Sequence, residues 1–174
     1  GRCITKHMGA KTNEIITGEY DYKGPSIIYG DTDSVYFSAY ESLKTEIDAG
    51  KIPWNKDSVV QLYDSVAEEV NKSFPTYMRQ AFNCPPTYGK IIAGGREIIG
   101  SKGLFITKKR YAIKIYDLEG EKVDKIKAMG LDLKRSDTPV FVQDFLSDIL
   151  YMVLTGKTEK EVLQAITDFR AEFK

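Results

Sequence analysis

The sequence predicts an α+β fold, in which an antiparallel sheet with packed helices is followed by a helical segment. Three observations favour this class: two apolar runs joined by a tight turn near residue 30, a second group of strand-like runs over residues 90–129, and helical spacing of apolar residues elsewhere. The 174 residues suffice for one ordinary domain or for a piece of a larger one.

The first elements are a helix and a hairpin. The near-helical spacing of Ile4, Met8, Thr12 and Ile15 predicts a helix over residues 2–16, and the turn-forming residues 17–25 predict a loop. We expect Ser26–Tyr29 and Asp33–Ala39 to form a hairpin with Gly30–Thr32 at its tip. Because their apolar residues are continuous rather than alternating, both faces of this pair should be covered.

A long amphipathic helix is predicted next, capped by Asp57 or Ser58 and kinked at Pro75. We expect it to lie across the sheet that holds the hairpin and to bury an apolar stripe, whose members recur every three or four residues: Val59, Leu62, Val66, Val70, Phe74, Met78 and Phe82.

The second strand group should consist of Lys90–Ile99 and Leu104–Asp117, joined by the flexible Gly100–Gly103, with a turn at Leu118–Gly120 before a strand at Glu121–Met129.

The last part of the chain changes character and is predicted to be helical. A helix should begin at Thr138-Pro139, run to about Thr155 and end at Gly156. Thr158 and Glu161 have the spacing of a capping box for a final helix.

Composition limits the possible functions. The 25 basic and 25 acidic residues balance, but residues 17–75 carry a net charge of −6 and residues 88–135 one of +6. This layout suits a polyanion bound beside cations, although ordinary solvated surface explains it equally well.

Cys3 and Cys84 fit no metal-ligand or disulfide spacing, and a single histidine, His7, argues against a zinc site or a histidine-based triad. Without a secretory signal or a long apolar stretch, we expect a soluble protein of a reducing cytoplasm, with no membrane partner.

The chemistry of the chain centres on Gly30-Asp31-Thr32-Asp33-Ser34, which carries two carboxylates one residue apart on a tight turn. Because a desolvated carboxylate needs a compensating charge, and hard oxygen ligands suit Mg²⁺, this pair predicts half of a metal site for phosphoryl transfer. Two-metal sites hold cations about 3.5–4 Å apart, and such a pair normally needs at least two bridging carboxylates. The motif alone is therefore incomplete.

The hexapeptide that begins at Tyr29 and ends at Ser34, YGDTDS, resembles the palm-domain metal motif of family B DNA polymerases. The resemblance continues in the expected order. Lys108–Tyr111 resembles the family's KKRY element, which tracks the primer–template duplex, and Met129–Leu131 with Lys134–Pro139 resembles the segment that crosses from palm to thumb and touches the primer strand. Arg96-Glu97 ahead of Gly100–Gly103 also resembles the palm of polymerases from large tailed bacteriophages.

The resemblance implies a C-terminal part of a palm domain over residues 1–135 and the beginning of a thumb domain over 136–174. It implies that Asp33 bridges two Mg²⁺ ions, with Mn²⁺ a possible substitute, and that Asp31 is a less direct ligand or an outer-shell partner. Glu97 is either a further carboxylate near the metals or a strand residue paired with Arg96.

The resemblance also implies nucleic-acid contacts by six residues: Lys108, Lys109, Arg110, Tyr111, Lys134 and Arg135. On one short strand, the first three cannot all be buried, and a phosphate backbone neutralises such a group by counterion release. Tyr111 can pack or hydrogen-bond at the minor-groove side of the primer terminus, an edge that reports little about base identity.

The implied activity is template-directed addition of nucleotides to a primer 3′ end, with primer–template DNA and deoxynucleoside triphosphates as partners. The other essential Asp, the fingers and the exonuclease would come from an N-terminal polymerase portion, so we expect an excerpt or one subunit of a split enzyme that is inactive alone. If the source is a bacteriophage, the host cytoplasm is the expected location. Two alternatives stay open: a non-catalytic nucleic-acid-binding or scaffold subunit with a palm fold, and another two-metal enzyme such as a nuclease or nucleotidyl cyclase.

Overall fold

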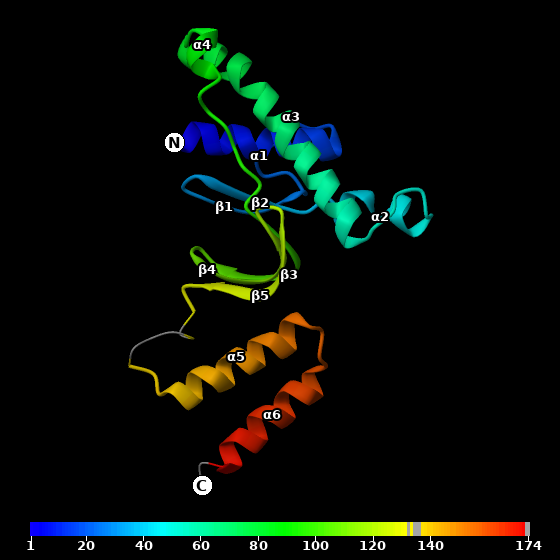
Figure 1. Cartoon of the computed structure of the whole chain (residues 1–174), viewed down its shortest axis with the longest axis vertical. Coiled ribbons are helices and arrows are strands. Elements are labelled where there is room, and N and C mark those ends of the chain that lie inside the picture. Colours follow the sequence, from blue (N-terminus) through cyan, green and yellow to red (C-terminus); the bar gives the residue numbers. More distant parts are fainter. Residues whose placement is uncertain (132, 134–136, 173–174) are drawn as a thin grey trace. The chain divides into compact units, whose positions relative to one another are not determined.

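The computed structural model describes residues 1–131, 133 and 137–172. It divides into two compact units, Gly1–Glu97 and Ile98–Lys174. The α+β class is confirmed, because helices accompany antiparallel sheets in the described residues (Figure 1).

The first unit contains a two-stranded hairpin and its helices. Its elements are α1 (Arg2–Thr17), β1 (Ile27–Asp31), β2 (Ser34–Phe37), α2 (Tyr40–Asp48), α3 (Lys56–Phe82) and α4 (Pro86–Gly89). The helix predicted over residues 2–16 is confirmed, whereas α2 and α4 had no predicted counterpart. α1 contacts both strands of the hairpin and also α3 (Figure 1). It therefore joins the long helix to the turn that carries the carboxylates.

The core of this unit forms where α3 meets α1. Val66, Val70 and Phe74 of α3 are buried, with Phe74 fully so, and apolar residues of α1 pack against them. α3 reaches the hairpin through Phe37, whose ring lies 5.0 Å from that of Tyr63. The apolar stripe is thus confirmed as core over residues 59–74 but not at its end, where Phe82 is 50% exposed. We expected the stripe to pack on the sheet of the hairpin, and it packs on α1 as well.

Two details of these elements differ from the prediction. The cap of α3 is Asn55 rather than Asp57 or Ser58: its side chain accepts a bond from Ser58 N–H, and the Ser58 hydroxyl accepts one from Asn55 N–H. The prediction that both faces of the hairpin are covered is wrong for β1, where burial alternates and Ile28 is 49% exposed.

The predicted strand at Lys90–Ile99 is also wrong, because regular pairing begins only at Ile98. The Asn71 side chain donates to the Gly94 carbonyl at 2.8 Å and accepts from its N–H at 2.7 Å. A side-chain amide of α3 thus satisfies the backbone groups that a neighbouring strand would otherwise bind.

The second unit is a three-stranded antiparallel sheet with a helical hairpin. Its strands are β3 (Ile98–Thr107), β4 (Arg110–Leu118) and β5 (Glu121–Met129), in the order β3-β4-β5, and its helices are α5 (Val140–Leu154) and α6 (Glu159–Glu172). Leu150 and Leu154 of α5 pack on Ala112 of β4. The predicted capping box is confirmed, since Thr158 N–H donates to the Glu161 carboxylate at 2.8 Å and the Thr158 hydroxyl accepts from Glu161 N–H at 3.3 Å.

Gly100–Gly103 is not a flexible linker but lies inside β3. Gly100 pairs with Ile115, and a Cβ at Gly100 would overlap the Ile113 side chain. The glycine is therefore needed for close packing between strands. The reversal of the chain occurs instead at Lys108 and Lys109.

Candidate metal-binding turn and nucleic-acid interface

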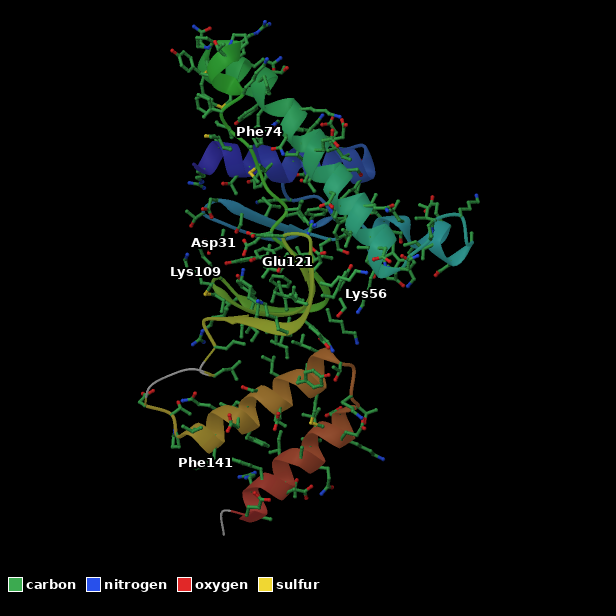
Figure 2. All side chains as sticks on the ribbon, in the orientation of Figure 1. Asp31, Lys56, Phe74, Lys109, Glu121 and Phe141 are labelled. Atoms are coloured by element: carbon green, nitrogen blue, oxygen red, sulfur yellow. The ribbon has the colours of Figure 1, made fainter. Side chains whose placement is uncertain are left out.

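The two motif carboxylates lie on the two-residue turn between β1 and β2. Asp31 ends β1 and pairs with Ser34, so the tip of the hairpin is Thr32-Asp33 rather than the predicted Gly30–Thr32. Asp31 is half-buried and Asp33 is exposed. Figure 2 labels Asp31 at the end of its strand.

Asp31 is tied to its own turn by three hydrogen bonds. Its Oδ1 accepts from the Thr32 N–H at 2.9 Å and from the Thr32 hydroxyl at 3.1 Å, and its Oδ2 accepts from the Tyr29 hydroxyl at 3.3 Å. These bonds fix the orientation of the carboxylate. The side chain is therefore positioned before any ligand arrives.

A second contact holds the turn from α1. The Thr5 hydroxyl donates to the Thr32 carbonyl at 2.8 Å. This carbonyl belongs to the peptide group between Thr32 and Asp33, so the bond restrains the backbone from which the exposed Asp33 carboxylate projects. Sequence reasoning missed Thr5, because a threonine on a helix gives no signal that it reaches a turn 27 residues away.

The approach to the hairpin is organised by Asn13, which is completely buried. Its amide donates to the Thr17 hydroxyl at 3.0 Å and to the Glu19 carbonyl at 2.8 Å, and its Oδ1 accepts from the Ser26 N–H at 3.2 Å. The loop that leads into β1 is thus bonded to α1 at both ends. Sequence reasoning missed Asn13, because at 3.6 residues per turn it lies on the side of the helix opposite Ile4 and so away from the predicted apolar face.

The third candidate carboxylate, Glu97, is exposed and directly precedes β3. Arg96, its neighbour, forms an ion pair with Asp64 of α3 at 2.5 Å. Among the described residues, no three side chains of the His, Cys, Asp or Glu type lie close enough together to hold a metal ion. Asp31 and Asp33 share one turn, therefore, without a complete ligand set around them.

The basic residues form a turn rather than the single strand that we predicted. Lys108 and Lys109 make the reversal between β3 and β4, and Arg110 begins β4. All three are exposed, and Lys109 adopts a left-handed backbone with a φ of 62°. Figure 2 labels Lys109. Their exposure suits the charge neutralisation expected of phosphate-contacting residues.

Tyr111 differs from these neighbours in being only 6% exposed, with its ring stacked on Phe105 at 5.7 Å. It pairs with Met129 across β4 and β5, which brings the start of the proposed palm-to-thumb crossing beside the basic turn. Lys134 and Arg135 lie outside the described residues.

His7 is packed rather than placed at the carboxylate turn. Its Nε2 lies 2.8 Å from the Ser73 hydroxyl, its Nδ1 lies 2.7 Å from the Tyr20 hydroxyl, and its ring stacks on Tyr77 at 3.9 Å. Burial, and secondarily the charge of Lys11, lower the pKa of His7 from its ordinary value of 6.5. A neutral imidazole thus joins α1 to α3.

Comparison with known proteins supports the resemblance read from these motifs. The family model of DNA polymerase family B matches residues 95–173. The chain is 29% identical to the DNA-directed DNA polymerase of Escherichia phage RB69 over 168 residues, which cover 88% of this chain and 18% of that protein. It is 28% identical to the DNA-directed DNA polymerase of Enterobacteria phage T4 over an alignment of 197 positions, which covers 100% of this chain and 20% of that protein.

The chain thus spans about a fifth of the length of these curated relatives. The family match covers the basic turn, the three-stranded sheet and the C-terminal helices, and the alignment with the T4 enzyme extends over the carboxylate turn as well. Residues 95–173 therefore match DNA polymerase family B, and the chain as a whole is homologous to the phage T4 and RB69 DNA polymerases over about 20% of their length.

Proposed function

We propose that this chain supplies a metal-binding turn and a duplex-contacting turn to a DNA-directed DNA polymerase, which extends a primer 3′ end. The observation that carries the proposal is the exposed Asp33 beside the bonded Asp31 on one hairpin turn, in a chain homologous to polymerases. Primer–template DNA and deoxynucleoside triphosphates are the proposed partners, and the cytoplasm of a bacterial host is the proposed location. No helix in the described part of the chain is long and apolar enough to cross a membrane.

The donor set fits Mg²⁺ in kind, because carboxylate oxygens are the hard ligands that this ion prefers. Asp33 would hold the two ions, and Asp31, whose carboxylate already accepts hydrogen bonds from Tyr29 and Thr32, would assist or orient the site. When bound, such ions activate the attacking hydroxyl and stabilise the leaving oxygen, and Mn²⁺ can replace Mg²⁺.

Of the two carboxylates only Asp33 is proposed to bridge the ions, and a two-metal site normally needs at least two bridging carboxylates. We therefore propose that the site is completed by another Asp from the remaining polymerase. The same portion would supply the fingers and the exonuclease. Glu97 is a weaker candidate for a third carboxylate, since it lies outside the hairpin, directly before β3. The chain by itself should therefore show no primer extension.

The basic turn would perform the second task, which is to hold the duplex. Lys108, Lys109 and Arg110 are exposed at one reversal of the chain and can neutralise phosphates without reading sequence. Lys134 and Arg135 are proposed to extend this contact. Tyr111, buried against Phe105, would support the turn from beneath, and its proposed minor-groove contact would need the ring edge to stay accessible.

The test is Asp33→Ala in the chain assembled with the rest of the polymerase. We expect nucleotide incorporation to fall by more than about 100-fold while duplex affinity changes little, because only the metal-dependent step is removed. Asp48→Ala, which removes an exposed carboxylate from the end of α2, is the matched control and should retain activity. Near-normal extension by Asp33→Ala would contradict the proposal and favour a nucleic-acid-binding subunit without chemistry.

A further inference from the structure

The end of β5 passes directly over the basic turn. Tyr111 of β4 pairs with Met129 of β5, so that Gly130, the next residue, lies against Lys109. A Cβ at Gly130 would come within 3.1 Å of Arg110 Cγ and would overlap the carbonyl oxygen of Lys109, closer than real Cβ atoms approach. Only glycine allows the two backbones to lie this close.

Both partners in this contact have unusual backbones. Gly130 has a φ of 65° and Lys109 a φ of 62°, and both values fall in the left-handed region. This conformation is unfavourable for a lysine and persists only where surrounding structure holds it. The turn can hold this conformation beside β5 only because residue 130 lacks a Cβ: the Lys109 carbonyl oxygen already lies against Gly130, so a larger residue there would force the Lys109 peptide group to move.

We propose that Gly130 is a positioning residue for duplex binding: it keeps the Lys108–Lys109 turn in the conformation that directs its cationic side chains to the phosphate backbone. The inference rests on the proposed function of this turn. Lys108, Lys109 and Arg110 are exposed on long side chains, so the direction in which they leave the turn is set by the backbone beneath them. A larger residue at position 130 would push the turn away and change that direction.

The chain offers a matched control at the other end of β5. Gly120 has a φ of 93°, so an alanine there suffers the same kind of backbone strain as one at Gly130. A Cβ at Gly120 would meet nothing within 4 Å, however, whereas one at Gly130 would meet the backbone of Lys109. A comparison of Gly130→Ala with Gly120→Ala therefore isolates the contact with the turn.

The experiment measures the affinity of the assembled polymerase for a primer–template duplex over a range of salt concentrations. We expect Gly130→Ala to weaken binding about 10-fold at low salt and to reduce the slope of log K against log salt by about 1, as for the loss of one phosphate contact. Gly120→Ala should stay within about twofold of wild type with an unchanged slope. Equal effects of the two variants, or an unchanged slope in Gly130→Ala, would overturn the inference.

Three further variants keep the test decisive. If Gly130→Ala does not fold, Gly130→Asn and Gly120→Asn replace the pair, because asparagine tolerates the left-handed region while its Cβ retains the collision at Gly130.

The double variant Lys108→Gln with Lys109→Gln tests the duplex contact of the turn itself. If that double variant binds normally, the proposed duplex contact fails and the inference fails with it; if it weakens binding while Gly130→Ala does not, only the inference about Gly130 fails.

Discussion

Removal of the Asn13 side chain should destabilise the first unit more than any comparable change of a surface asparagine. Asn13→Ala deletes two donated bonds, to Thr17 and Glu19, and leaves the Ser26 N–H without the Oδ1 acceptor that it uses in the folded chain. Ser26 is completely buried, so water cannot replace that partner without rearrangement. At about 0.5–1.5 kcal/mol per bond, the three lost bonds predict a decrease of about 2–4 kcal/mol in the free energy of unfolding.

Asn13→Asp provides a sharper comparison. It keeps an oxygen that can accept from the Ser26 N–H, but it places a negative charge against the Glu19 carbonyl that the amide formerly bonded. Because this site is fully buried, the aspartate should be at least as destabilising as the alanine at pH 7.

Urea denaturation followed by the fluorescence of Trp54 measures these effects. Trp54 is the single tryptophan, and its ring lies 5.6 Å from that of Tyr40 in the same unit. Asn55→Ala removes the cap of α3 instead and should cost only about 1 kcal/mol. A loss below about 1 kcal/mol in Asn13→Ala would refute the reasoning, since it would show that the loop into β1 does not depend on these bonds.

Two further predictions concern the same unit. The Ser73 hydroxyl donates to the Val70 carbonyl at 2.6 Å, so His7 donates to it from Nε2 and accepts from Tyr20 at Nδ1, in the neutral form. Because the folded state lowers the pKa of His7, its contribution to stability is complete above pH 6.5 and is lost as the pH falls through the lower folded value; urea titrations should show this decline, and His7→Phe should flatten it. Phe74→Ala should cost about 3–5 kcal/mol of unfolding free energy by the same assay, because this ring is 0% exposed, and a loss under about 2 kcal/mol would contradict its place at the centre of the core.

Several elements could be predicted from local sequence alone. The long helix, the C-terminal helices and the capping box at Thr158 follow from periodicity and capping chemistry, which act over a few residues. The carboxylate hairpin was recognisable because two apolar runs flank a short polar turn, although its tip is Thr32-Asp33 rather than the predicted Gly30–Thr32. The strand predicted over residues 90–97 could not be corrected from local sequence, because the Asn71 side chain of α3 bonds the backbone groups of Gly94 that a neighbouring strand would otherwise bind.

The sequence by itself determined the family motifs, the α+β class and the residue types that can carry metal and phosphate chemistry. Only the tertiary structure decided how these residues are held: Thr5 bonds the carboxylate turn, and Gly130 passes over the basic turn. Contacts of this kind join residues far apart in the chain, and no local pattern encodes them. A glycine in a sequence also gives no sign of whether it provides flexibility or close approach, and at Gly100 and Gly130 the packed neighbours show that it is close approach.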